Sequence, residues 1–288
     1  MVARTTAPAP PQRRRLLPSR AAYRELAIFA AGYLTYFGVR ALTEGSPARA
    51  FGNAMRLHRL EVDVGIDWEH AVQDAVLAER GLVGIANAVY IYGHWPVLIG
   101  AGLLLYRYRR SHYYRLRNVC LLTGLLGLAV FALFPVAPPR LTDLPVIDTV
   151  TRDSDGYRQL FPPSIVNEYA AMPSFHAGWN LLVGIVVFSA CRHWVVRAFA
   201  VLMPLAMALA VVATANHFVI DVLVGVSIVL AALAIEPRLA PRRLGYDDEH
   251  EYGDRRRRGP PVRGRPSCGQ RSRPPAVGSG ARTAARRG

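Results

Sequence analysis

Long apolar stretches alternate with short arginine-rich connectors along most of the chain, and both ends are polar. A helix needs about 20 mostly apolar residues to cross a bilayer. Six stretches approach this length: 26–42, 82–106, 118–134, 174–191, 195–213 and 218–235. The pattern predicts an all-α, polytopic membrane protein, a bundle of six transmembrane helices within residues 23–240.

The polar segments between and around these stretches differ in kind. Residues 43–80 carry apolar side chains near helical spacing, so part of this loop is expected to form an amphipathic helix lying on the membrane. The positions concerned are Leu57, Leu60, Val64, Trp68, Val72 and Val76. Residues 1–22 and 241–288 are basic and contain proline, which favours disorder.

The charge is strongly positive, with a formal net value of +15. Nucleic-acid binding is not the preferred explanation, because the arginines gather in the terminal segments and beside apolar stretches. Membrane proteins concentrate such residues on the cytoplasmic side. The arginines place both termini in the cytoplasm and the loops 43–80 and 135–173 outside, in a protein of the inner membrane. The basic cytoplasmic segments are expected to contact anionic lipid headgroups.

The sequence contains three cysteines and no CxxC pair. This composition argues against a disulfide framework and against a cysteine zinc site. No metal site and no cofactor are predicted.

Three short motifs fall on the predicted outer side. They are APPRL at Ala137–Leu141, AAMPSFHAGWN at Ala170–Asn180 and TANHFVIDVLVG at Thr214–Gly225. Because the orientation was assigned from arginines alone, this convergence is an independent indication of a site.

The third motif places His217 and Asp221 four residues apart on one helix face. A carboxylate at this position can orient an imidazole and leave its other nitrogen free to act as a nucleophile or base. An ionisable residue inside an apolar helix is also a functional candidate by default. The alternative is a polar pair that packs two helices together. The same spacing occurs at His70/Asp74 and at His250/Asp254.

The other two motifs carry groups suited to phosphate. Ser174 is a natural cap for a helix whose free N–H groups can bind phosphate, and His176 in its first turn could protonate a leaving oxygen. Arg140 follows two prolines and could hold phosphate through two parallel hydrogen bonds, or it could be an ordinary interfacial arginine. Asn216 is a candidate cap for the last helix.

His94 lies inside the second apolar stretch, one turn after Tyr90. A histidine at that depth needs a partner, so the two residues either line a substrate cavity or bond across helices.

Together the motifs APPR, PSFH and HFVID resemble the type 2 phosphatidic acid phosphatase superfamily, in the same order. The resemblance implies a six-helix membrane fold. It also implies that His217 is a nucleophile forming a phosphohistidine, with Asp221 orienting it and His176 as general acid. Arg140 and Ser174 would hold phosphate.

The departures from the superfamily pattern point to one branch. Leu133, Leu141, Phe175 and Val211 replace a lysine, a proline, a glycine and an arginine of the usual motifs. The segment LEVDVGIDWEHAVQ and the Tyr90/His94 pair also resemble the inositol phosphorylceramide synthase branch, an inositolphosphotransferase. Because Leu133 and Val211 replace a lysine and an arginine, two of the usual phosphate-binding cations are missing.

The leading hypothesis is metal-independent transfer of a phosphoryl or phospho-headgroup from a membrane lipid, to water or to an alcohol. A proton-coupled transporter or flippase would use the same His and Asp as a relay. A non-catalytic membrane scaffold is the third possibility.

Overall fold

The computed structural model describes residues 20–42, 47–153 and 167–239. Within these ranges the chain is helical apart from its turns and one isolated bridge between Val136 and Ala170. The all-α prediction is therefore confirmed for this part. The basic segment before residue 20 and the tail after residue 239, with His250/Asp254, lie outside the described residues.

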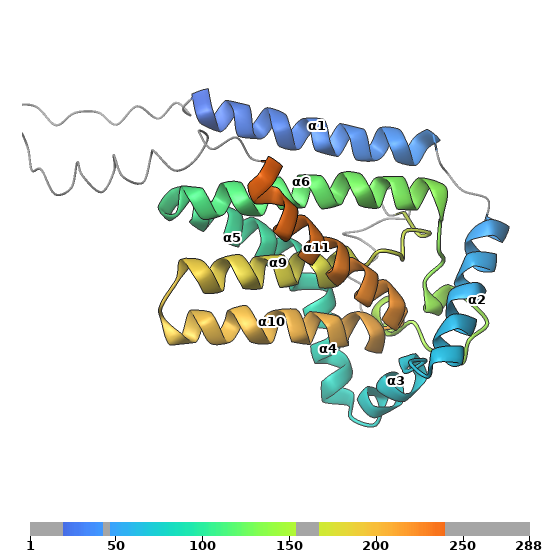
Figure 1. Ribbon diagram of the computed structural model, residues 1–288. Coiled ribbons are helices and arrows are strands. Elements are labelled where there is room, and N and C mark those ends of the chain that lie inside the picture. The colour runs from blue at the N-terminus through green and yellow to red at the C-terminus, as the bar shows by residue number, and fades with distance from the viewer. Residues whose placement is uncertain (1–19, 43–46, 154–166, 240–288) are drawn as a thin grey trace, which may run out of the picture. The chain divides into compact units, whose positions relative to one another are not determined.

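The helices follow one another with short connections (Figure 1). They are α1 (Arg20–Leu42), α2 (Pro47–Val64), α3 (Glu69–Leu77), α4 (Arg80–Tyr92), α5 (Trp95–Tyr108), α6 (Arg110–Leu133), the 3₁₀ turn η1 (Pro139–Leu141), α7 (Thr149–Asp153), α9 (Phe175–Ala190), α10 (Trp194–Ala213) and α11 (Val219–Leu239).

Several helices have the length and composition of membrane spans. Helices α6, α10 and α11 are long and apolar enough to cross a bilayer, and α4 with α5 qualify as one bent pair. The apolar helix α9 is shorter, with 16 residues. The chain is a membrane protein by these criteria, whereas the full set of six spans stays a prediction.

Two expected boundaries are wrong. The second apolar stretch is not one helix, because it breaks between Tyr92 and Trp95 with a bend of 48°. The third does not begin at residue 118, since α6 already starts at Arg110. The arginine-rich connector is therefore part of the helix, and guanidinium groups cover tyrosine rings along it, such as that of Arg117 over Tyr114, a favourable contact.

The amphipathic segment forms two helices, α2 and α3, separated by a turn at Gly65 with φ 72°. Its predicted apolar stripe does not face one environment. Leu57 is buried against the protein core, whereas Leu60 and Val64 are exposed. The helix therefore packs one face on the rest of the domain and leaves a second apolar face uncovered.

Helix α9 is the centre of the bundle and contacts α5, α6, α10 and α11. Two glycines permit the closest approaches. A Cβ on Gly184 would collide with the backbone of α10, and a Cβ on Gly225 would collide with the carbonyl of Ser174. Helices α2 and α3 lie at the end of the bundle where α9 and α11 begin (Figure 1).

Helix α1 is held to α6 by polar contacts. The Glu25 carboxylate accepts hydrogen bonds from the Tyr113 hydroxyl at 3.0 Å and from Arg117 at 2.7 Å. Charge-assisted bonds of this kind are among the stronger ones in proteins, so they fix a helix that is otherwise largely exposed.

Candidate active site

His217 lies in the tight turn between α10 and α11 and is 6% exposed. Its Nδ1 is 2.8 Å from the carbonyl oxygen of Ala171. Because a carbonyl only accepts, Nδ1 must carry the proton and donate it. Nε2 is left with its lone pair and makes no hydrogen bond within the described part of the chain. This is the tautomer that a nucleophilic or basic imidazole needs.

Asp221 is fully buried, and its Oδ2 is 3.6 Å from His217 Nδ1. That separation is longer than a hydrogen bond. Oδ2 instead accepts from the N–H of Phe218 at 2.9 Å, and Oδ1 has no hydrogen-bond partner among the described residues. The carboxyl group of Asp221 therefore lies beside the imidazole without a hydrogen bond to it, while the Ala171 carbonyl sets the tautomer.

A backbone hydrogen bond joins the second motif, at the start of α9, to the third motif, at the start of α11. The N–H of Ser174 donates to the carbonyl of Asp221 at 3.0 Å. The glycine of α11 at position 225 allows this approach, and a Cβ on Gly178 would lie 2.8 Å from the Gly225 oxygen. The starts of α9 and α11 are consequently held in fixed register.

His176 comes from the first turn of α9 and faces His217, with ring centroids 5.7 Å apart. Its ring stacks on Tyr90 at 4.7 Å and lies 4.4 Å from the ring of His94. His176 and His217 thus lie side by side, as the site hypothesis requires, and His94 adds a third imidazole next to His176.

His94 lies at the break between α4 and α5 and is 3% exposed. Its Nδ1 is 3.3 Å from the amide nitrogen of Asn180, which also donates to the carbonyl of His176 at 2.9 Å. Since this amide nitrogen only donates, His94 Nδ1 accepts. The ring of Trp179 stacks over His94 at 6.0 Å. Asn180 was not predicted as a site residue, although it is polar and sits one turn after His176 in an apolar helix.

The two residues expected to hold phosphate are engaged within the protein. Arg140, in η1, donates to Asn216 at 3.0 Å and pairs with Asp148 at 3.2 Å. The Ser174 hydroxyl accepts from the N–H of Ala177 at 3.4 Å, as a helix cap does. Arg140 nevertheless lies next to the turn that carries His217, because its N–H donates to the carbonyl of Ala215.

Asn216 does not cap α11, contrary to expectation. Its side chain is occupied by Thr214 and Arg140. The first N–H groups of α11 go instead to two glutamates, with Val219 donating to Glu69 at 2.8 Å and Ile220 to Glu61 at 2.7 Å. The sequence separation is too large for a local pattern to reveal this pairing.

Burial raises the pKa of Glu61 to about 9. The hydrogen bond from Ile220 opposes the shift, and the nearby carboxylate of Glu69 adds to it. Desolvation disfavours the charged form of a carboxyl group, as does a second negative charge. The start of α11 is therefore bordered by two carboxyl groups that are both ionised only at a cost unless a cation lies beside them.

The departures from the motif pattern have structural counterparts. Phe175 stacks on Trp179 at 4.8 Å and fills the space over Gly127, where a Cβ would overlap its ring. Val211 is completely buried among apolar residues, whereas Leu133 is 72% exposed. None of these positions supplies a cation to the histidines.

A family model described as the PAP2 superfamily matches residues 55–235, which include all three motifs. The chain belongs to the PAP2 superfamily. The expected resemblance to this superfamily is confirmed.

One relative is the phosphoinositol dihydroceramide synthase of Bacteroides thetaiotaomicron, 31% identical over 152 residues. The match covers 47% of this chain and 49% of the relative, so the chain spans about half the length of that protein. The crystal structure of LpxE from Aquifex aeolicus has a TM-score of 0.47 at 17% identity, covering 60% of this chain and 94% of that one. At this score the likeness says nothing about the reaction.

Proposed function

We propose that this PAP2-superfamily protein transfers a phosphoryl or phospho-headgroup from a phospholipid through a phosphohistidine on His217. The observation that carries the proposal is that the ring of His217, whose Nδ1 is held by a carbonyl, has its centroid 5.7 Å from that of the His176 ring. A phosphorus atom between the two rings would be in reach of both a nucleophile and an acid, which is the arrangement that this chemistry needs.

In the first step, Nε2 of His217 attacks the phosphorus and forms a P–N bond while the P–O bond to the leaving group breaks. Protonated His176 gives its proton to the leaving oxygen. The imidazole of His217 becomes positively charged, and the buried carboxylate of Asp221 at 3.6 Å stabilises that charge.

In the second step, the acceptor hydroxyl loses its proton to the now neutral His176 and attacks the same phosphorus. The P–N bond breaks, and His217 returns to its starting tautomer with Nδ1–H on the Ala171 carbonyl. Water as acceptor gives a phosphatase, and an alcohol gives a transferase. Neither step calls for a metal ion at the phosphorus.

The substrate's phosphate would be held at the mouth of this site by Arg140 and Ser174, with Tyr90 and His94 lining the wall behind His176. Arg140 would exchange the Asp148 carboxylate for a phosphate oxygen, since both offer the guanidinium the same kind of acceptor. The scarcity of further cations suits a singly charged phosphodiester. The name of the Bacteroides relative favours a phosphoinositol group.

We place the site at the extracytoplasmic face of the inner membrane, with six spans and both termini in the cytoplasm, because arginines gather at the opposite connectors. Accessibility mapping tests this orientation. In a variant without native cysteines, Asp143→Cys should react with a membrane-impermeant thiol reagent in intact cells, and His193→Cys should react only after lysis. Both positions are exposed. The reverse labelling would overturn the orientation.

The reaction itself is tested with phospholipids that carry ³²P in the headgroup phosphate. Purified protein should release or transfer label, and a base-stable, acid-labile adduct should form on the chain. Loss of both in His217→Ala supports the nucleophile. Turnover that survives this substitution would rule it out. Absence of turnover with every lipid, together with lipid movement in proteoliposomes, would favour a transporter or flippase. Absence of both turnover and lipid movement would favour a scaffold.

A further inference from the structure

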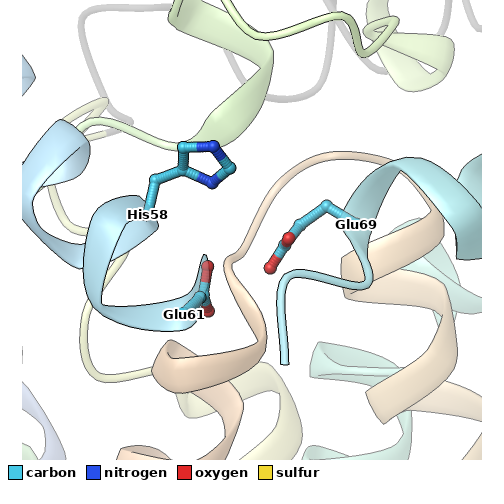
Figure 2. A group of neighbouring side chains, drawn as sticks. All are labelled: His58, Glu61 and Glu69. Carbon is cyan, nitrogen blue, oxygen red and sulfur yellow. The ribbon is translucent and has the colours of Figure 1, made fainter. Parts of the chain in front are cut away.

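A second group of chemically active side chains lies apart from the three imidazoles. His58 and Glu61 are one turn apart on α2, and Glu69 is the first residue of α3. Figure 2 shows the three side chains converging from the two helices on one space beside the chain that starts α11. One potential ligand atom from each residue lies within 4.8 Å of the others.

The two carboxylates of this group are almost completely buried, with Glu61 0% and Glu69 3% exposed. One oxygen of each accepts a backbone N–H of α11. The second oxygen of Glu61 and the Nδ1 of His58 are buried and have no hydrogen-bond partner in the described ranges. Buried polar atoms of this kind usually have a partner.

The surroundings supply no compensating side-chain charge. Within the described part of the chain, neither Glu61 nor Glu69 forms an ion pair with an arginine, and the sequence has no lysine. A proton shared by the two carboxylates would serve the orphaned oxygen of Glu61 but would leave the imidazole nitrogen unpaired. A cation bound by all three side chains would serve both atoms.

We propose that His58, Glu61 and Glu69 bind one divalent transition-metal ion, of the Zn²⁺ or Mn²⁺ class. One imidazole and two carboxylates are a suitable set for such ions, whereas Mg²⁺ and Ca²⁺ favour oxygen ligands throughout. The backbone N–H groups of Val219 and Ile220 orient the carboxylates, as outer hydrogen bonds orient ligands in metal sites.

The ion has a structural role in this proposal, which goes beyond the proposed function. It ties α2 and α3 to the first turn of α11, next to the turn that carries His217. It does not touch the reacting phosphorus, so the steps at the histidines are unchanged.

The test measures metal directly. Full-length protein, with any affinity tag removed, is stripped with a chelator, incubated with ZnCl₂ or MnCl₂, desalted and analysed by mass spectrometry of the metal. Wild type should retain about one ion per chain, and its thermal midpoint should rise with the free metal concentration, as expected for a ligand of the folded state.

Two variants keep the proposal falsifiable. Glu69→Gln retains an oxygen for the Val219 N–H but loses the ligand charge, and His58→Ala removes the half-buried imidazole. Each should lower metal affinity ~10-fold or more, by analogy with the effect of lesser changes around metal ligands.

The matched controls are Asp74→Asn and His70→Ala, an exposed acid and an exposed histidine on α3, which should bind metal as wild type does. Equal metal retention in wild type and both site variants would overturn the proposal and leave the shared proton as the explanation. Since neither readout uses turnover, failure here is distinct from failure of the proposed reaction.

Discussion

The start of α11 and the helix α3 both contain a histidine four residues before an aspartate, with nearly equal separations between nitrogen and oxygen. The distance is 3.6 Å for His217/Asp221 and 3.5 Å for His70/Asp74. Their side chains are 8% and 0% exposed in the first pair but 57% and 60% exposed in the second. Among the residues that the structure describes, only the first pair lies beside other imidazoles.

The comparison teaches that spacing alone does not make a site. In water, a His–Asp pair of this geometry is screened and contributes little. In a buried turn, the same pair is shielded from water, so the electrostatic interaction between its two members is stronger. The same substitutions made at both pairs therefore measure how much the buried surroundings contribute to activity.

The largest effect is expected from His217→Ala. If this imidazole forms the covalent intermediate, lipid turnover should fall by at least ~10⁴-fold, as for other nucleophiles. His70→Ala should leave turnover within about two-fold, as expected for a surface change. Initial rates with one labelled phospholipid measure both. Equal losses of turnover in the two variants would show that the effect is not specific to the buried histidine, and would contradict the distinction between the two pairs.

The second effect is expected from His176→Ala, with a loss of ~10²–10⁴-fold, the range of general acid catalysis. The loss should shrink when the leaving group is a weakly basic phenol, because such a group departs without a proton. Rates for an alkyl and a nitrophenyl phosphodiester, measured side by side, reveal this. A loss that does not depend on the leaving group would assign His176 a packing role.

The third effect is expected from Asp221→Asn. The Ala171 carbonyl already fixes the tautomer of His217, so only the charge beside the imidazole is lost. The decrease in kcat should be about 10²-fold, smaller than the roughly 10⁴-fold loss expected where a carboxylate alone sets the tautomer. Asp74→Asn is the matched control and should be neutral. A loss as large as that of His217→Ala would contradict the carbonyl's role.

The smallest effect on activity, but a clear one on stability, is expected from Gly225→Ala. The added methyl group would collide with the Ser174 carbonyl, and overpacking of this kind costs about 1–3 kcal/mol. Gly84→Ala in α4 has open space around the new Cβ, and it should be neutral or stabilising because alanine favours helix. Thermal unfolding in detergent compares the two. A stable Gly225→Ala protein would show that the α9–α11 contact is adjustable.

Much of the helical architecture follows from composition, because apolar stretches of bilayer length have few alternatives to helix. The positions of α9, α10 and α11 agree with the predicted stretches to within a few residues. The break at His94 was missed because the stretch was interpreted as one span from its apolar composition, although Gly93 and Pro96 flank this histidine. Pro96 in the first turn of α5 has no N–H to donate back to α4, and its ring would clash with the Tyr92 carbonyl in a continuous helix.

The candidate site was likewise predictable from the sequence only in part. Local spacing predicted that His176 and His217 lie at helix starts, and the structure places them together. It could not predict that Ala171 would orient His217, or that Glu61 and Glu69 would replace Asn216 at the start of α11. These pairings join residues from 46 to 159 positions apart, and only the packed fold brings them into contact.

The fit of Phe175 over Gly127 has a consequence for how relatives of this chain can diverge. A relative with glycine at position 175 would have a cavity the size of a benzyl group. A larger side chain at position 127 could fill that cavity. Among relatives, a smaller side chain at position 175 should therefore be accompanied by a larger one at position 127, and the reverse. A compensated swap of their sizes should be tolerated better than either single replacement.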